Sequence, residues 1–228
     1  MNGRPSARIV LLLLFLFATI FPLSSARAAG KAGLYLIRME PYGADAEEYS
    51  RPGWGGGAHV VAPIPDVNQL LAGTAGLEFV NLMTETKKFR DSVTGLRTEQ
   101  QTSQNYGRLY VGAEIGPHGG GFFRPHVGTN IAWTFYWIDT DVVIPDDSAR
   151  ENEIRQDLES EWENAFGWDV TIGLDLNFSN KVPVEIGVRY MKSFGVPQQL
   201  GDKAEKIHPE YFQVYAGVGV SFDAFRKS

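Results

Sequence analysis

The sequence predicts an all-β protein, an eight-stranded antiparallel up-and-down transmembrane β-barrel that follows a cleaved N-terminal signal peptide. Three observations predict this fold: an N-terminus typical of exported proteins, segments in which polar and apolar residues alternate, and connections that are alternately long and short. No later apolar run is long enough for a transmembrane helix. An exported chain without such a helix can span a membrane only as a closed barrel, because its backbone hydrogen bonds must all be satisfied inside the bilayer.

Residues 1–28 have the parts of a secretory signal peptide. Arg4 and Arg8 precede the apolar run Val10 to Leu23, and Ala26-Arg27-Ala28 fits the A-x-A cleavage pattern. The run is too short to span a bilayer comfortably, which disfavours an uncleaved membrane anchor. We therefore expect residues 1–28 to be removed and residues 29–228 to form one outer-membrane β-barrel domain.

The composition fits a single exported domain with an acidic balance. Without the three arginines of residues 1–28, 18 basic residues oppose 27 acidic ones, so the expected mature chain has a net charge of −9. This charge argues against a nucleic-acid partner. The chain contains no cysteine, so no disulfide framework is expected.

Eight segments show the period of two that is typical of half-buried β-strands. In the clearest of them, Val170, Ile172 and Leu174 lie on one face, whereas Thr171 and Gly173 lie on the other. The second segment alternates least clearly because it is rich in glycine. The expected strands are 31–41, 55–64, 73–83, 104–115, 122–138, 165–177, 182–194 and 209–222.

Two features favour a membrane barrel over a soluble, lipocalin-like barrel, whose apolar residues would line the inside. The connections alternate in length: the long ones are 42–54, 84–103, 139–164 and 195–208, and the short ones are 65–72, 116–121 and 178–181. Long extracellular loops and short periplasmic turns are typical of outer-membrane barrels. Aromatic residues also gather at strand ends, where they can form a belt at each membrane interface. The outer belt would hold Trp133, Phe135, Trp137, Trp168, Tyr190 and Phe212, and the inner belt Phe123, Phe178 and Phe222.

The last expected strand resembles the C-terminal insertion signal of outer-membrane β-barrels. In YAGVGVSF, the polar, glycine, apolar and aromatic positions of that pattern are Tyr215, Gly217, Val220 and Phe222. Family members commonly end on the aromatic residue, whereas here six residues follow Phe222. The resemblance implies that the barrel assembly machinery reads this strand during insertion.

The segment FFRPHVGTNIAW, residues 122–133, resembles the R-P-Y-V-G-x-G strand of opacity-like outer-membrane proteins. His126 stands where tyrosine is usual, and Asn130 where a small residue is common. At the level of pattern the resemblance covers the mature chain and extends to the OmpA transmembrane domain and its eight-stranded relatives. It implies a location in the bacterial cell outer membrane, among lipid and lipopolysaccharide. It says little about activity, because this scaffold carries anchors, adhesins, narrow pores and lipid-modifying enzymes.

The interior of an eight-stranded barrel has room for little beyond side chains. Strand alternation points charges of both signs inward, and they must largely pair because an unpaired buried charge is costly. We expect a charge network that plugs the lumen; the alternative is a narrow or gated pore lined by the same residues. The expected members are Arg38, Glu78, Arg108, Glu114, Arg124, Asp169, Asp175, Glu185 and Arg189.

The histidines do not predict a catalytic or metal site. Lipid A deacylases of this architecture use a lipid-facing serine–histidine pair. Here no serine lies two positions after His126, and the alternation of its strand points His126 inward. His118 lies in a short glycine-rich turn that is expected on the periplasmic side. No two histidines have a metal-ligand spacing, so we expect neither a metal nor a cofactor.

The connection 139–163 is strongly acidic, with ten acidic residues opposed by two arginines. Ser148-x-x-Glu151 forms a capping-box pattern, and an apolar series at four-residue spacing follows it. This series, Ile154, Leu158 and Trp162, predicts a short exposed helix; a flexible solvated loop is the alternative. The carboxylates could hold divalent cations that also bridge lipopolysaccharide phosphates.

The sequence thus favours a non-enzymatic outer-membrane barrel with a structural or surface-interaction role and a largely plugged lumen. The alternatives are a narrow porin-like channel for small solutes, a lipid-modifying enzyme and a soluble periplasmic binding barrel. Expected partners are outer-membrane lipid, lipopolysaccharide and, during insertion, the barrel assembly machinery.

Overall fold

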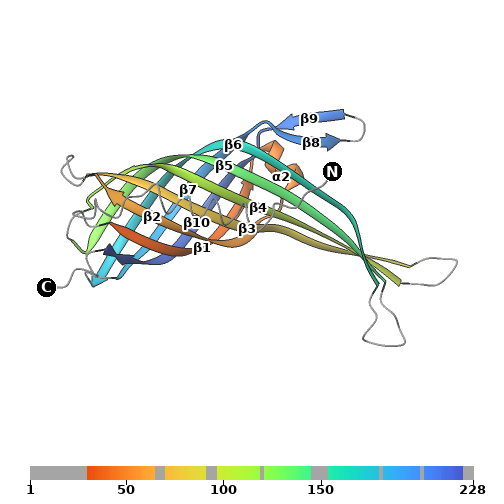
Figure 1. Cartoon of the computed structure of the whole chain (residues 1–228), viewed down its shortest axis with the longest axis horizontal. Coiled ribbons are helices and arrows are strands. Elements are labelled where there is room, and N and C mark those ends of the chain that lie inside the picture. Colours follow the sequence, from red (N-terminus) through yellow and green to blue (C-terminus); the bar gives the residue numbers. More distant parts are fainter. Residues whose placement is uncertain are drawn as a thin grey trace.

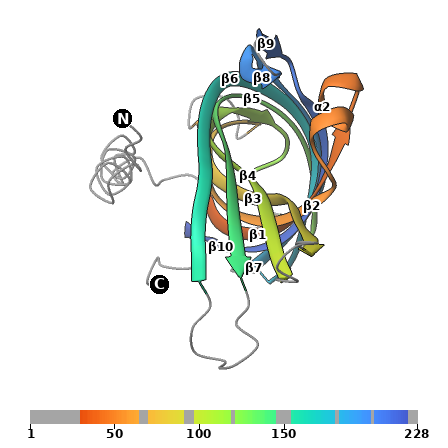
Figure 2. The same ribbon diagram turned by 90° about the vertical axis from the view of Figure 1, so that its right-hand side faces the viewer.

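The computed structural model describes residues 30–64, 70–90, 97–118, 121–144, 154–179, 182–200 and 203–222. Eight of its strands form one closed antiparallel barrel in the order β1-β10-β7-β6-β5-β4-β3-β2 (Figures 1 and 2). These strands are β1 (Lys31–Tyr42), β2 (Gly53–Pro63), β3 (Leu71–Arg90), β4 (Arg97–Ile115), β5 (Phe123–Ile144), β6 (Ile154–Ser179), β7 (Val182–Phe194) and β10 (Glu210–Ser221). The predicted fold class is confirmed, whereas the predicted signal peptide lies outside the described residues.

The pairing of β1 with β10 closes the barrel and defines its two ends. It runs from Lys31 opposite Ser221 to Tyr42 opposite Glu210. We call the end that holds Lys31 the inner end and the end that holds Tyr42 the outer end. Because neighbouring strands are antiparallel, the connections 64–70, 116–122 and 180–181 leave from the inner end, as the alternation of connections predicts.

Two small elements at the outer end have no counterpart in the prediction. The helix α2 (Ala44–Tyr49) lies between β1 and β2. The strands β8 (Val196–Leu200) and β9 (Lys203–Ile207) form an antiparallel hairpin between β7 and β10. Both lie at the rim of the barrel from which the longest strands extend (Figures 1 and 2). Among the described residues, no helix is long and apolar enough to cross a bilayer.

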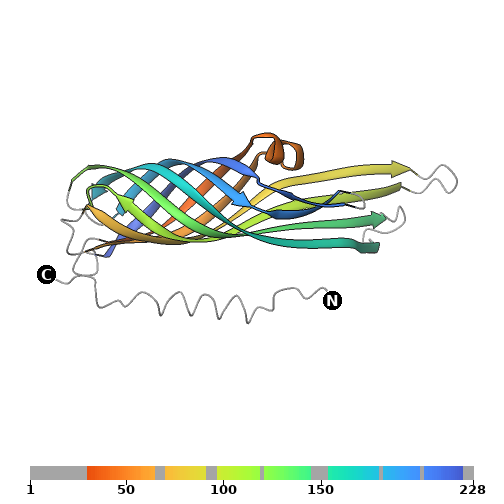
Figure 3. The same cartoon turned by 90° about the horizontal axis from the view of Figure 1, so that it is seen from above.

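The strands β3 to β6 continue well past the outer rim, where the sequence predicted loops (Figure 3). Most of 84–103 and 139–164 is therefore strand, and the helix expected around Ile154, Leu158 and Trp162 is wrong from residue 154 onward. The residues before 154 that belonged to that helix lie outside the described ones. A strand is favoured because β5 offers a ladder that runs inward from Ile144 opposite Ile154, with one register shift between Thr140 and Asp141, whereas a short isolated helix is marginal in water.

Along the barrel wall, residues alternate between a polar interior and an apolar exterior. The outward-facing side chains form an exposed aliphatic band, which includes Leu34, Leu36, Val111, Val127, Ile131, Ile172, Ile186, Val214 and Val218. A surface of this kind is stable in lipid rather than in water, because large exposed apolar areas are disfavoured on soluble proteins.

Aromatic residues border this band at both ends. At the outer end, Trp133 stacks on Phe166 with ring centroids 6.1 Å apart, and at the inner end Phe122 packs edge-on against Phe178 at 5.4 Å. Three pairs drawn from the two predicted belts are each ten residues apart: Phe123 and Trp133, Phe178 and Trp168, and Phe222 and Phe212. Ten residues that rise about 3.3 Å each in a strand tilted by about 40° cover about 25 Å, the height of the apolar band in outer-membrane barrels.

Candidate functional site

A cluster of four charged residues fills the middle of the barrel. Glu78 on β3, Arg108 on β4, Asp169 on β6 and Arg189 on β7 all point inward and are at most 3% exposed. Two carboxylates face two guanidinium groups, so the cluster is formally neutral. We call these residues the central cluster.

The barrel topology lets the central cluster cross the lumen. Arg189 pairs with Glu78, although in the strand order three strands separate β7 from β3 in either direction. Arg108 pairs with Asp169 and also lies 3.5 Å from Glu78, its register neighbour on β3. Arg189 Nε lies 3.6 Å from Asp169 Oδ1. The Arg189–Glu78 pair therefore joins opposite walls of the barrel directly, and the other pairs connect strands that lie next to each other or two apart.

Neutral groups complete the hydrogen bonding of these carboxylates. The Tyr35 hydroxyl donates to Glu78 at 2.8 Å, and the side-chain amide of Gln213 donates to the same carboxylate at 3.1 Å. The Asn130 amide donates to Asp169 at 2.7 Å. The guanidinium of Arg189 lies 5.1 Å above the centre of the Tyr110 ring. Because buried ions are tolerated only when paired and hydrogen-bonded, this surrounding shell lets four charges remain in the interior.

An apolar layer closes the lumen between the central cluster and the outer end. Its fully buried members include Ile37, Met39, Val80, Leu82, Tyr106 and Tyr211. The layer is tied to the rim, because Ala46 of α2 joins it and the Ser50 hydroxyl lies 3.1 Å from that of Tyr211. Side chains from the walls and from α2 therefore exclude water here as they do in a soluble protein core.

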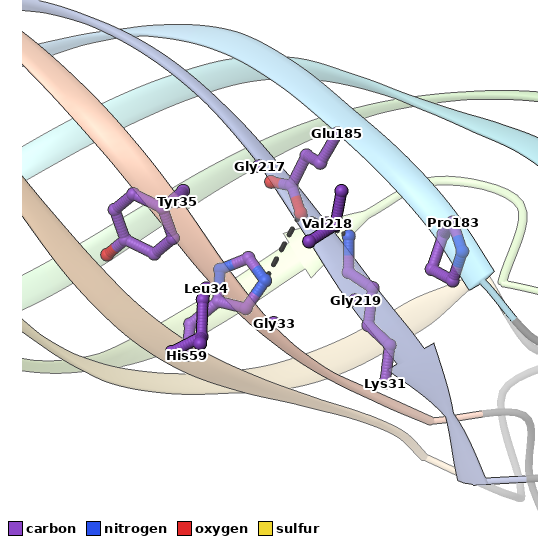
Figure 4. A pocket seen from close by; sticks show the side chains of 10 residues that line it. All are labelled: Lys31, Gly33, Leu34, Tyr35, His59, Pro183, Glu185, Gly217, Val218 and Gly219. Atoms are coloured by element: carbon purple, nitrogen blue, oxygen red, sulfur yellow. Dashed lines mark hydrogen bonds and ion pairs between the residues drawn. The ribbon is translucent and has the colours of Figure 1, made fainter.

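A second charge cluster lies between the central cluster and the inner end. Lys31 Nζ donates to Asp175 at 2.6 Å and to Glu185 at 2.7 Å. Two imidazoles approach the same Glu185 carboxylate, His59 at 3.2 Å and His126 at 3.6 Å. Figure 4 shows His59 facing Glu185, with Lys31 beside them. We call these five residues the inner cluster.

The pockets around the inner cluster are no larger than a water molecule. The pocket in Figure 4 has about 10 Å³ and lies where Gly33, Gly217 and Gly219 leave the β1–β10 seam without side chains. A second pocket, of about 20 Å³, lies between the two clusters and is lined by Glu114 and Asn130. A volume of this size has room for about one water.

Glu114 faces the second pocket and is less well satisfied than the other carboxylates. Its Oε1 is buried without a hydrogen-bond partner among the described residues. The nearest basic nitrogen is Nδ1 of His118, 3.5 Å away in the inner turn. Burial lowers the pKa of His118, which favours its neutral form.

Eight of the nine residues expected in the lumen point inward. Arg124 lies at the inner end, 3.5 Å from Asp175, and the other seven belong to the groups described above. The expectation for Arg38 is wrong. It faces outward at the outer end, pairs with Glu40 at 2.7 Å and lies 5.1 Å above the Trp54 ring. The cause is that the inward positions of this part of β1 are apolar, Ile37 and Met39.

Sequence reasoning missed Lys31 and the neutral partners of the carboxylates. Lys31 is the first residue of β1 and lies four positions before the inward-facing Tyr35, so its side chain faces inward as well. Alternation could not reveal it, because both faces of β1 carry apolar residues. Tyr35 and Gln213 were missed for another reason: their roles depend on contacts across the lumen rather than along one strand.

The residues of the expected insertion signal occupy both faces of the last strand. Tyr215 points inward and donates to Glu185 at 3.0 Å, and Gly217 also faces the interior. Val220 is exposed on the lipid side, and Phe222 follows the strand beside Gly30. The structure thus gives these residues places in the barrel wall, whereas their role in insertion stays a prediction.

Three of the four histidines belong to the inner half of the barrel. His59 and His126 point into the lumen, and His118 lies in the inner turn. His208 precedes β10 at the outer end, where its ring accepts a hydrogen bond from the Gly195 amide at 3.1 Å. Among the described residues, no group of three or more histidine and carboxylate side chains has a geometry that could hold a metal ion.

Comparison with solved structures finds this fold in outer-membrane proteins. The chain is similar to Neisserial surface protein A with a TM-score of 0.53 and 12% identity, over 85% of this chain and 97% of that one. Two weaker similarities are to a major outer membrane protein of Thermus thermophilus (TM-score 0.49, 14% identity, 85% and 100% covered) and to Ail, the attachment invasion locus protein of Yersinia pestis (0.45, 12%, 86% and 97%). No protein-family model and no curated protein sequence matches the chain.

Proposed function

We propose that this protein is a bacterial outer-membrane barrel with a plugged lumen, whose function is to hold an interaction surface outside the cell. The central cluster carries this proposal. The Arg189–Glu78 ion pair joins opposite walls, the pairs of Arg108 with Glu78 and Asp169 lie beside it, and the apolar layer lies next to them. A solute would have to break these pairs in order to pass.

The exterior supports the membrane location. Exposed aliphatic side chains circle the barrel between two aromatic levels, and their spacing matches the apolar thickness of an outer membrane. The fold similarity to Neisserial surface protein A, a surface protein by its name, fits the same location. Outer-membrane lipid and lipopolysaccharide are then the surroundings of the barrel, and the barrel assembly machinery is its partner during insertion.

The outer end supports a surface role. The extensions of β3 to β6, the helix α2 and the β8–β9 hairpin all lie there (Figure 1). A barrel that only anchored itself would not need strands that continue so far beyond the membrane. No catalytic role is proposed for the histidines, because His59 and His126 are held by Glu185 and His208 is held by backbone groups and Asp45.

Planar-bilayer recording tests the proposal. Refolded wild-type protein that migrates on gels as a heat-modifiable barrel should show no steady conductance. The Arg189→Ala variant should be less stable and should conduct intermittently, because a side chain that crosses the lumen is lost. Large, steady wild-type conductance, with a variant that is equally stable but altered in ion selectivity, would instead establish the narrow-channel alternative.

A further inference from the structure

Beyond the outer rim, the barrel wall opens into a four-stranded sheet with two edges. Pairing of β2 with β3 ends at Trp54 opposite Asn81, whereas β3 stays paired with β4 as far as Arg90. On the other side, pairing of β6 with β7 ends at Phe166 opposite Phe194, whereas β6 stays paired with β5 as far as Ile154. Within the described part of the chain, 83–90 of β3 and 154–164 of β6 are therefore paired on one side only. Edges of this kind present a row of backbone groups to which another strand can add.

The two edges carry opposite charges. The edge of β3, 83–90, has three basic residues and one acidic residue, and we call it the basic edge. The edge of β6, 154–164, has four acidic residues and one arginine, and we call it the acidic edge. Lys88 of the basic edge illustrates its exposure, since its side chain is 72% accessible although it pairs with Glu99. Like edges repel each other, whereas a basic and an acidic edge attract.

The direction of the strands fits pairing between copies. The strand β3 runs away from the membrane and β6 runs toward it, because β3 starts and β6 ends at the inner end. Two copies inserted in the same direction in one bilayer therefore present the basic edge of one and the acidic edge of the other as antiparallel strands. Every neighbouring pair in the barrel has this arrangement.

The hairpin leaves most of the acidic edge uncovered. Its first residue, Val196, joins the apolar cluster together with Ala165, which lies just below the acidic edge. In Figure 1, β8 and β9 project along the upper side, whereas the far part of β6 bends to the opposite side, away from the hairpin. Strand addition along 154–164 is therefore compatible with the hairpin.

We propose that copies of this protein associate side by side in one membrane, with the basic edge of each copy paired to the acidic edge of the next. The contact is heterologous, since it joins two different surfaces, and each copy keeps one edge of each kind available. Such contacts produce rows rather than closed dimers unless the rotation happens to close a ring. The proposal rests on the proposed function, because insertion in a common direction aligns the edges.

Charge exchange between two variants tests this pairing. The first variant combines Lys87→Glu with Lys88→Glu and so makes both edges acidic; the second combines Glu159→Lys with Glu161→Lys and so makes both edges basic. The matched control for the first variant combines Lys203→Glu with Lys206→Glu on the hairpin strand β9, which makes the same charge change outside both edges. Because the chain has no cysteine, Glu48→Cys on the exposed surface of α2 gives every protein one dye site.

Energy transfer between labelled copies in phosphatidylcholine liposomes is the readout, with carbodiimide crosslinking as the second. Wild type and the hairpin control should associate in low salt and less in high salt, because exposed charges are screened. Each edge variant alone should lose association at least about tenfold. An equimolar mixture of the two should recover it, since every basic edge then meets an acidic one.

Two results would overturn the pairing: energy transfer of wild type no greater than expected for randomly placed monomers, or no recovery in the mixture. Heat-modifiable gel migration of each protein shows whether it has inserted as a folded barrel. This measurement distinguishes failure of the pairing from failure of the proposed function. A wild-type barrel that inserts but stays monomeric contradicts only the pairing. A wild-type protein that does not insert contradicts the proposed function, and the pairing with it.

Discussion

Arg189 and Glu78 form an ion pair across the full width of the barrel, between strands that are as distant in the ring as eight strands allow. A pair along one wall would leave the lumen open beside it. The Arg189–Glu78 pair instead places charged side chains in the path itself. Since both carboxylates also accept hydrogen bonds from neutral side chains, the cluster is a structural core made of polar groups.

The first prediction concerns the energy of this pair. Arg189→Ala should lower the free energy of unfolding by about 3–5 kcal/mol, because Glu78 then keeps its charge in the interior without its closest partner. Urea unfolding of the folded barrel in lipid measures the loss. Arg38→Ala is the matched control, because that arginine faces outward, where it pairs with the half-exposed Glu40 and lies over the exposed Trp54 ring, so about 1 kcal/mol or less is expected. Equal losses for the two variants would show that the central cluster is solvated.

The second prediction concerns lipid exposure. Ile172→Arg and Ile186→Arg, on outward-facing positions of β6 and β7, should each cost about 2–4 kcal/mol near the middle of the membrane. Thr86→Arg, on the exposed part of β3 beyond the rim, should change stability by about 0.5 kcal/mol or less. Unfolding measured in lipid bilayers compares the three. If all three positions tolerate arginine equally, the band of aliphatic residues does not face lipid.

The barrel wall could be predicted from sequence because one physical pattern dominates it. Where one face meets lipid and the other meets a polar lumen, residues such as Ile172 and Thr171 alternate strictly, and the strand is evident. The alternation of polar and apolar residues is lost where both faces of the sheet contact water. Residues 98–103 are polar at every position, since both sides of the sheet are outside the membrane there, and a loop was expected in place of a strand.

The interior could be predicted as a list of residues but not as a set of contacts. Alternation along a single strand shows which side chains face the lumen, so it assigned Glu78, Arg108 and Arg189 to the interior. It does not show which of these side chains contact each other. Partners across the barrel depend on its closure and on strand stagger, which no single segment encodes. Arg38 was misplaced because a charged residue at the outer end is equally stable outside the barrel, above the membrane.

The third prediction concerns insertion of the barrel. Phe222→Asp should reduce the amount of folded protein in the outer membrane severalfold, because the aromatic residue of the expected insertion signal is lost. Phe222→Tyr keeps the ring and should behave as wild type. Cell fractionation with heat-modifiable migration measures both. Normal outer-membrane levels of Phe222→Asp would mean that Tyr215 to Phe222 are not read as a signal.

The fourth prediction concerns closure of the barrel at the β1–β10 seam. A Cβ atom at Gly217 would clash with the Leu34 carbonyl oxygen and lie 2.6 Å from Tyr35 Cβ, so Gly217→Ala forces β1 and β10 apart. Tyr35 donates to Glu78 from this seam, so its displacement also disturbs the central cluster. The cost should be about 1–3 kcal/mol, the range for overpacking a well-packed interior.

Gly73→Ala is the control for that variant, because it is also a strand glycine of the barrel wall. The nearest atom to its added Cβ would be the Ala62 carbonyl oxygen at 3.9 Å, an ordinary contact. This substitution should be neutral or stabilise by up to about 1 kcal/mol, since alanine restricts the unfolded chain more than glycine does. Urea unfolding in lipid compares the two variants. If Gly217→Ala is as stable as Gly73→Ala, the seam can widen without loss, and close packing of β1 against β10 is not what holds the barrel shut.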